Sequence, residues 1–566
     1  MTALNAEQTL IPTDFIFVGM ALVNTFFTAY SLLFKTDFKP FLILFVVCVA
    51  LTCVFKEKIY TVYYTKATGY TLPFALIIYF LAASVPIHYD SGLYHIQALK
   101  WIEEYAVVPG LGNLHGRLAF NPNLFNLTAG FSFSQFFNQP IYAINSFFGI
   151  VFLYFILTIF LERNRKLPDV LSVFIFLLGT FSILFIDARV PYPTTDLAAG
   201  LLPFYLFIRY LIALNAPEQK SKLLFSSDLI VVFIIIAVYI LTVKLSSLPI
   251  LLLPILLLFR FKNTFDKRLL LYAFATAVFI ILPWLIRNYF LSGYLIFPFP
   301  SIDIFNPDWK IPISAVDFER RSVTDWAKIA STNFSQIGKM PIIEWFPIWY
   351  KNISITWRIM IALAFASPIL FGLEYYFNKN LRISNDFLII WFTSFIGTCF
   401  WLFTAPDVRF GFPFIITAAL SPILFLDNFF LKLRKINTII RKTEKKTAIL
   451  LPLISPSIFV GLLFVLHFKQ FLFLRHDAPE IRFLKPLAPD SQTFYRSKDV
   501  EGANKNVEYS NKRIEYEIKK IGNFKLFVPV NDDRCYCQPL PCTPYYNEKL
   551  ILRGETLQEG FRVNNN

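Results

Sequence analysis

Residues 71–105 read TLPFALIIYFLAASVPIHYDSGLYHIQALKWIEEY, an apolar run that turns abruptly into a polar and charged segment. As a helix, the apolar run can cross the hydrocarbon core of a bilayer, which is about 30 Å thick. His88, Asp90 and His95 stand directly after it, and His115 follows within the same region. Because the whole chain has only 5 histidines, the gathering of three of them beside a carboxylate marks this segment as a candidate functional site.

The composition excludes a soluble globular protein. The chain has 566 residues, 56% of them hydrophobic, and its mean hydropathy is +0.55. The net charge of +15 fits basic loops facing anionic lipid better than nucleic-acid binding. No GxxxxGK or GxGxxG phosphate loop is present, so nothing supports direct nucleotide use. The N-terminus lacks the basic region and cleavage site of a signal peptide, and 14–34 is expected to be a retained span.

Apolar runs recur along the chain and predict an all-α polytopic membrane protein with about 13 transmembrane helices. The predicted helices lie near 14–34, 40–55, 70–86, 137–161, 168–187, 195–214, 226–243, 246–260, 269–290, 357–377, 386–404, 410–431 and 448–468.

Lysine and arginine are unevenly divided between the two sets of loops. With the N-terminus in the cytoplasm, the cytoplasmic loops carry 21 lysines and arginines, and the short outer loops carry 5. This bias predicts a multi-pass protein with its C-terminus outside the cytoplasm. We expect the membrane to be a bacterial inner (plasma) membrane. We expect a membrane domain over 1–468 and a small extracytoplasmic domain over 469–566. The segments expected together on the outer face are 87–136, 187–196, 291–356, 405–410 and 469–566.

Asp90 precedes a predicted surface helix, 92–105, whose apolar residues recur every third position. This rhythm places His95, Glu103 and other polar side chains toward water. Asp90 either caps the helix, as aspartate often does, or acts as a general base that accepts a proton from an acceptor hydroxyl. A carboxylate between apolar walls would have a raised proton affinity. Asp90 and His95 are therefore the candidate catalytic residues.

His88 and Asp90 could also supply two ligands to a divalent cation, Mg or Mn, with Glu103 or His115 as a third. No other cofactor is indicated. In the glycine-rich stretch 110–120, GLGNLHGRLAF, His115 and Arg117 offer hydrogen-bond donors to a phosphate or a sugar. The alternative is that this stretch only connects two elements.

Arg189, Lys244 and Arg409 each occupy a short outer turn, where the orientation rule disfavours positive charge. Cations kept there need a partner. We expect these three residues, with His88, His115 and Arg117, to bind a lipid phosphate or pyrophosphate. Ion pairing with Asp187 or Asp407 is the alternative.

The later outer segments carry aromatic residues and cysteines. The loop 291–356 contains four tryptophans, which are expected to anchor surface helices and could also cover a lipid tail or a sugar ring. The tail contains CYCQPLPC over 535–542. Outside the cytoplasm a disulfide from Cys542 to Cys535 or Cys537 is favoured over a zinc site.

The outer side of an inner membrane holds no ATP, so a transferase acting there needs a donor carried on a lipid. The arrangement resembles the C superfamily of membrane glycosyltransferases, which have many helices and an early outer loop bearing an acidic residue. In that superfamily the loop usually follows the first helix, whereas here it follows the third. HYDSGLYHIQALKWIEEYAVVPGLGNLHGRLAFN and CYCQPLPCTPYYNEKLILRG more closely resemble an uncharacterised bacterial multi-spanning membrane-protein family.

The superfamily resemblance implies sugar transfer from a polyprenyl-phosphate-linked donor to a glycan or lipid acceptor of the cell envelope, in polysaccharide biosynthesis. A transporter or flippase for a lipid-linked or anionic substrate is the alternative from another class. A polysaccharide polymerase or ligase would share most of the same parts.

Overall fold

The computed structural model is mostly helical. It describes residues 10–63, 66–82, 88–137, 140–161, 174–175, 177–179, 192–214, 227–262, 266–330, 334–377, 385–425, 515–530 and 532–564. The predicted helix 448–468, most of 168–187, and Arg189 lie outside these residues.

Among the described residues, six helices contain a stretch long and apolar enough to cross a membrane, and they indicate a membrane protein. These helices are α1 (Pro12–Leu33), α2 (Phe38–Tyr63), α10 (Asp196–Leu214), α14 (Lys267–Ser292), α18 (Ile355–Phe377) and α19 (Asn385–Thr404). Four further helices of the bundle are α3 (Lys66–Ala82), α8 (Ile144–Leu161), α12 (Ser227–Val243) and α20 (Val408–Leu420). Each of the ten lies on a helix predicted from the sequence.

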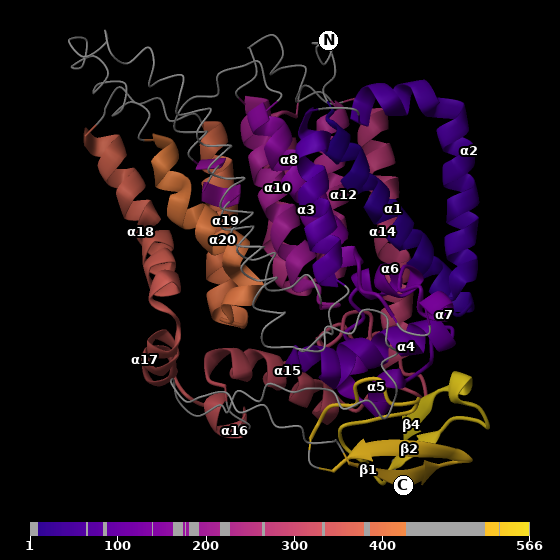
Figure 1. The fold of residues 1–566 in the computed structure, drawn as a ribbon. Helices are drawn as coiled ribbons and strands as arrows, with labels where there is room; N and C mark the ends of the chain where they lie inside the picture. Colours follow the sequence, from indigo (N-terminus) through magenta and orange to yellow (C-terminus); the bar gives the residue numbers. More distant parts are fainter. Residues whose placement is uncertain are drawn as a thin grey trace, which may run out of the picture.

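The position of each helix in the bundle follows from its side chains. α10 lies at the centre, and 94% of its most apolar stretch is buried by other parts of the protein. α2 lies at the edge of the bundle in Figure 1, and only 6% of its most apolar stretch is buried. Exposed apolar residues such as Phe45 and Val54 cover its surface. In water this surface would be unfavourable, whereas a lipid bilayer covers it.

The predicted pair of short helices over 226–260 is separated at Lys244. α12 ends at Val243, and Lys244 has an extended backbone (φ −157°, ψ 120°). A 3₁₀ helix over Leu245–Leu251 and α13 (Leu252–Arg260) follow. This break leaves the Lys244 side chain at the end of α12.

Short elements gather at one end of the bundle, below the long helices in Figure 1. We call the segment between α3 and α8 the first loop. It contains a π-helix (Ser91–His95), α4 (Ile96–Glu104), α5 (Leu111–Leu114), a 3₁₀ helix (Gly116–Ala119), α6 (Leu124–Gly130) and α7 (Ser134–Phe137). We call the segment between α14 and α18 the second loop. It contains α15 (Ile313–Lys328), α16 (Phe334–Ile337) and α17 (Ile342–Asn352).

A further 3₁₀ turn, Ser421–Phe425, follows the last residue of α20.

The end of the chain forms strands, so the all-α prediction is wrong for this segment. β1 (Tyr516–Ile521) pairs antiparallel with β2 (Phe524–Pro529), and β3 (Leu550–Leu552) pairs antiparallel with β4 (Phe561–Val563). A 3₁₀ turn, Leu557–Glu559, lies between β3 and β4. Of the two cysteine pairings left open by the sequence, the structure contains the disulfide Cys535–Cys542, and Cys537 is free.

Residues 515–564 do not form a hydrophobic core separate from the membrane part. Leu526 and Phe561 belong to the same buried cluster as Trp101 and Leu111 of the first loop. Gln97 of α4 donates hydrogen bonds to the carbonyls of Tyr536 (2.9 Å) and Gln538 (3.0 Å). The C-terminal segment therefore covers the first loop.

Gly92 is the point of closest approach between the two. A Cβ atom at Gly92 would lie 2.4 Å from Cζ of the Tyr536 ring, and the Tyr536 amide donates to the Gly92 carbonyl at 2.9 Å. We expect Gly92→Ala to displace Tyr536 and weaken attachment of the C-terminal segment by about 1–3 kcal/mol. Burial raises the pKa of the neighbouring Cys537 thiol to about 11. Exposure should therefore speed its modification by a maleimide, measured by peptide mass spectrometry.

Gly19→Ala in α1 is the matched control, because a Cβ there meets no atom within 4 Å. An unchanged Cys537 modification rate in Gly92→Ala would contradict the packing described.

Candidate functional site

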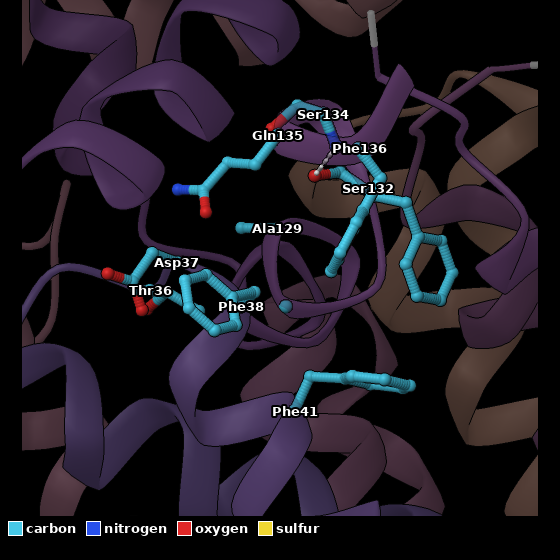
Figure 2. A pocket seen from close by; sticks show the side chains of 11 residues that line it. Thr36, Asp37, Phe38, Phe41, Ala129, Ser132, Ser134, Gln135 and Phe136 are labelled. Atoms are coloured by element: carbon cyan, nitrogen blue, oxygen red, sulfur yellow. Dashed lines mark hydrogen bonds between the residues drawn. The ribbon is translucent and has the colours of Figure 1, made fainter. Parts of the chain in front are cut away.

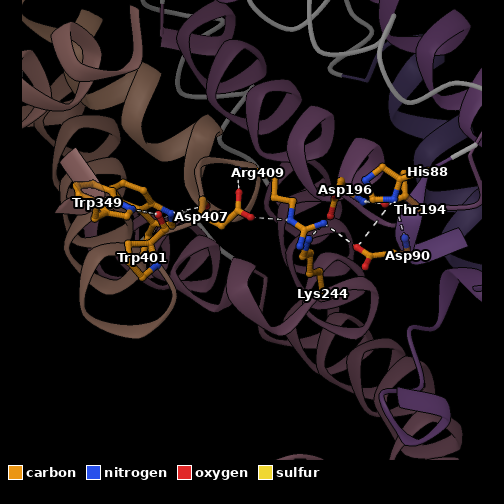
Figure 3. A network of polar contacts seen from close by, with 10 residues as sticks. His88, Asp90, Thr194, Asp196, Lys244, Trp349, Trp401, Asp407 and Arg409 are labelled. Atoms are coloured by element: carbon orange, nitrogen blue, oxygen red, sulfur yellow. Dashed lines mark hydrogen bonds and ion pairs between the residues drawn. The ribbon is translucent and has the colours of Figure 1, made fainter. Parts of the chain in front are cut away.

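Asp90, from the loop after α3, forms an ion pair with Arg409, from the first turn of α20. Arg409 Nη1 donates to Asp90 Oδ2 at 2.8 Å, and Arg409 Nε donates to Asp407 Oδ2 at 2.9 Å. Figure 3 shows Arg409 between the two carboxylates. Two residues 319 positions apart in the sequence thus meet at one end of the bundle.

The turn that carries Arg409 is held from both sides. Asp407 caps α20, because its side chain accepts a hydrogen bond from the Arg409 amide at 3.0 Å. Trp401 Nε1 donates to the Asp407 carbonyl at 2.6 Å, and Trp349 Nε1 donates to the Pro406 carbonyl at 2.7 Å (Figure 3). Trp349 comes from α17 in the second loop, so the aromatic loop helps to position the guanidinium.

A second ion pair joins Lys244 to Asp196, the first residue of α10. Both side chains are largely buried, with 16% and 7% of their surfaces exposed. Lys244 Nζ also lies 4.2 Å from the centre of the Phe410 ring, next to Arg409. We call Asp90, Asp196, Lys244, Asp407 and Arg409 the ion cluster. It gathers residues from the starts of the π-helix, α10 and α20 and from the end of α12.

The structure corrects two expectations for Asp90. Its side chain makes no capping hydrogen bond to the helix that follows. Its proton affinity is low rather than high. Although burial alone would raise it, the charges of Arg409 and His88 hold the pKa of Asp90 well below its usual range. Asp90 is therefore a carboxylate at any physiological pH, and a weak base while Arg409 remains bound to it.

The cations of the outer turns have partners within the protein. Arg409 pairs with Asp90 and Asp407, and Lys244 pairs with Asp196. These two residues therefore do not require an external anion, and their binding of a lipid phosphate stays a prediction. The ion pairing that the sequence left as the alternative is present for Arg409 with Asp407.

His88 and His95 have different surroundings. His88 Nδ1 accepts a hydrogen bond from the Asp90 amide at 3.2 Å and lies 4.0 Å from Asp90 Oδ2. His95 is only 3% exposed and packs against Phe125, with ring centres 5.4 Å apart. Its Nδ1 has no hydrogen-bond partner among the described residues. The predicted exposure of His95 is wrong because α6 and the C-terminal segment cover this face of the π-helix and α4.

Both buried histidines should remain neutral. Burial lowers the pKa of His95 to about 3, and burial with the charge of Arg117 lowers the pKa of His115 to about 3. We expect their Cε1 resonances to stay at the neutral position from pH 5 to 8 in ¹³C-histidine NMR spectra. The unfolded chain binds these protons near pH 6.5, so acid below that pH should favour unfolding.

Histidine-to-glutamine variants at positions 95 and 115 assign the signals, since the chain has 5 histidines. A titration midpoint between pH 5 and 8 for either residue would contradict its burial.

His115 and Arg117 do not join the ion cluster through a hydrogen bond or an ion pair. Arg117 Nε lies 3.1 Å from Glu319 Oε2, and Arg117 Nη2 donates to Ser322 Oγ at 2.8 Å. The His115 ring packs toward Tyr545 of the C-terminal segment, with centres 6.3 Å apart. Both residues lie where the first loop meets α15 and the chain end.

The ligand set expected for Mg or Mn does not come together. Among the described residues, no group of three histidine, cysteine, aspartate or glutamate side chains is placed to hold a metal ion. Glu103, one of the two proposed third ligands, instead accepts a hydrogen bond from Ser134 Oγ at 3.0 Å. We therefore assign no step to a metal.

Glu103 lies near a surface pocket between the start of α2 and α7, which Figure 2 shows. Asp37, Phe41, Ser132 and Phe136 are among its lining residues. Glu103 is partly buried, with its Oε1 atom covered, so it is less exposed than predicted. Burial raises the pKa of Glu103 to about 7. The lining includes no member of the ion cluster.

Sequence reasoning missed three buried charges inside the helices. Asp14 of α1 and Arg209 of α10 form an ion pair with 0% and 2% of their side-chain surfaces exposed. Arg287 of α14 is 4% exposed. All three lie within predicted spans or at their ends, where an isolated charged residue was available as a signal of function.

The comparisons with known proteins place the chain in a family. The family model described as Domain of unknown function (DUF8201) matches residues 2–416. The chain belongs to this family. The matched part of this DUF8201 protein includes every member of the ion cluster, whereas the C-terminal strands lie beyond it. Neither a curated protein nor a solved structure matches the chain.

Proposed function

We propose that this DUF8201 protein is an integral membrane glycosyltransferase. It transfers a sugar from a polyprenyl-phosphate-linked donor to a glycan or lipid acceptor of the cell envelope, at the outer face of a bacterial inner membrane. The observation that carries the proposal is the contact of Asp90 with Arg409 at the ends of apolar helices. This contact brings a carboxylate beside a cation, and the proposal puts the pair at the level where a lipid phosphate and a water-soluble acceptor can meet.

The membrane topology belongs to the same proposal. About 13 spans with a cytoplasmic N-terminus put the end of the bundle that bears the ion cluster outside the cytoplasm. The short helices of the first and second loops lie at that end, as does the described C-terminal segment (Figure 1). The lysine and arginine bias of the loops supports this orientation.

The proposed reaction begins with the donor phosphate drawing Arg409 away from Asp90. Losing this cation raises the pKa of Asp90 toward the range of a useful base. The oxygen of the acceptor hydroxyl then bonds to the anomeric carbon of the sugar, and Asp90 accepts the proton that this hydroxyl loses. The bond from that carbon to the phosphate oxygen breaks, and the electron pair leaves with the polyprenyl phosphate. Arg409 and Lys244 stabilise the negative charge on this leaving group.

The donor assay tests the proposal directly. The full chain is reconstituted in liposomes with radiolabelled polyprenyl-phosphate hexoses and an envelope extract that supplies acceptors. We expect release of polyprenyl phosphate together with transfer of label to a glycan or lipid. A polymerase or ligase acting on longer lipid-linked glycans would instead consume an oligosaccharide donor in the same assay. No turnover of any lipid-linked donor would overturn the proposal.

A transporter or flippase is the second candidate, and one observation favours it. Asp14, Arg209 and Tyr205 form a buried polar group inside α1 and α10. A buried polar group within the membrane-spanning helices is the kind of feature that carriers use along a substrate or ion pathway. A carrier would move the lipid-linked sugar across liposomes without releasing polyprenyl phosphate, so the two functions differ in the products of one assay.

A further inference from the structure

Arg287 is a buried cation with one neutral partner. It lies in α14, five positions before the last residue, Ser292, and is 4% exposed. Its Nη1 donates to Ser31 Oγ at 2.9 Å, and the Ser31 hydroxyl donates onward to the Thr28 carbonyl at 2.8 Å. The buried Nε has no hydrogen-bond partner among the described residues. A guanidinium carries five N–H donors, so most of its capacity is unused by these contacts.

Other well-covered arginines in this chain have carboxylate partners. Arg209 pairs with Asp14 at 2.9 Å, Arg409 pairs with Asp90 at 2.8 Å, and Arg117 pairs with Glu319 at 3.1 Å. No carboxylate in the described part of the chain forms an ion pair with Arg287. A charge withdrawn from water is strongly unfavourable unless an opposite charge accompanies it. Arg287 thus differs from its neighbours in needing an anion that the described residues do not provide.

Arg287 lines a cavity rather than a closed core. The cavity is small and lies between α14, α4 and the stretch 116–125, and the space inside it that the centre of a water molecule can occupy is about 20 Å³. Arg117 lines it as well, and Ala98 and Phe125 contribute apolar wall. Since Glu319 already balances Arg117, the cavity retains an excess of one positive charge from Arg287.

We propose that this cavity binds a phosphate group, with Arg287 as its principal cation and Arg117 as a second donor. The planar guanidinium matches two phosphate oxygens at once, which a lysine cannot do. The apolar walls exclude water and strengthen the attraction. Arg287 and Ser31 lie near the ends of their helices, so a lipid phosphomonoester and free phosphate are two sources of the same chemistry. The proposal does not depend on sugar transfer.

Binding to the full chain in detergent tests the site. The ligands are inorganic phosphate and dioctanoyl phosphatidic acid, with dioctanoyl phosphatidylcholine as the lipid control. A ligand that binds only the folded chain raises the unfolding temperature, and the rise grows with the logarithm of the ratio of ligand concentration to Kd. We expect at least one of the two phosphomonoesters to stabilise the wild type and Arg287→Met to raise its Kd about tenfold or more. Arg320→Met, at an exposed position of α15, should leave the Kd unchanged.

The pattern of binding identifies the ligand's source. Stabilisation by phosphatidic acid alone assigns the site to a lipid headgroup, and stabilisation by inorganic phosphate alone assigns it to a soluble anion. If Arg287→Met does not fold, Ala98→Leu provides the second variant, because it fills the cavity and keeps both arginines. It should weaken binding similarly. No stabilisation of the wild type by either phosphomonoester, or an equal shift in every folded variant, would overturn the proposal.

Discussion

Asp90→Asn is expected to lower donor turnover by about 10²- to 10⁴-fold, the range over which a positioned general base contributes to catalysis. Asparagine keeps the size of the side chain and its ability to hydrogen-bond Arg409, but it cannot accept the acceptor's proton. Binding of the lipid donor should be retained or strengthened, because Arg409 then shares its charge with Asp407 alone. Turnover and donor binding are measured separately in the same liposomes.

Asp266→Asn is the matched control for this change. Asp266 caps the opposite end of α14, is exposed, and has no contact with the ion cluster. The pH dependence gives a further check. Since the pKa of Asp90 is lowered in the free protein, kcat/KM should show no loss from Asp90 protonation between pH 5 and 7. Normal turnover by Asp90→Asn would remove Asp90 from the mechanism.

Arg209→Met is expected to destabilise the protein by about 3–5 kcal/mol, because it leaves the buried Asp14 carboxylate without its cation. Arg209 Nε lies 3.1 Å from both carboxylate oxygens of Asp14, and its Nη2 donates to Oδ2 at 2.9 Å. Tyr205 also donates to the Asp14 carboxylate. Denaturant unfolding of the full chain in mixed micelles measures the loss.

The double variant Asp14→Leu with Arg209→Met separates the lost pair from the lost charge. With both charged groups replaced by apolar side chains, we expect much of the stability to return. Arg320→Met serves again as a surface control. If Arg209→Met alone were as stable as the wild type, Asp14 would have to be neutral or otherwise paired.

The helices could be predicted from the sequence because a membrane span requires a long run of apolar residues. A run such as 269–290 has few alternatives to a buried or lipid-facing helix, and α14 covers it. The C-terminal strands could not be predicted in the same way. Their alternating residues are few, and their buried side chains pack on a loop about 400 positions earlier.

For the candidate site, the sequence predicted which residues lie at the same end of the bundle but not which of them contact one another. The loop and turn assignments predicted that Asp90 and Arg409 share a face, whereas their ion pair depends on how the start of the π-helix packs against α20. Arg287 and Arg209 were overlooked because each sits singly in an apolar run. Whether such a residue has a carboxylate partner depends on a different helix, α1 in the case of Arg209.

The shared core of the first loop and the chain end has a consequence for biogenesis. Trp101, Val108 and Leu111 are synthesised more than 400 residues before Leu526 and Phe561, which bury them. Translation of a chain this long far outlasts the formation of a local helix. The first loop therefore stays incompletely covered until the C-terminal strands have been synthesised. These strands must also reach the same side of the bilayer as the loop. A stop codon that removes only the last fifty or so residues would leave the earliest polar loop without its cover, although every upstream helix remained intact.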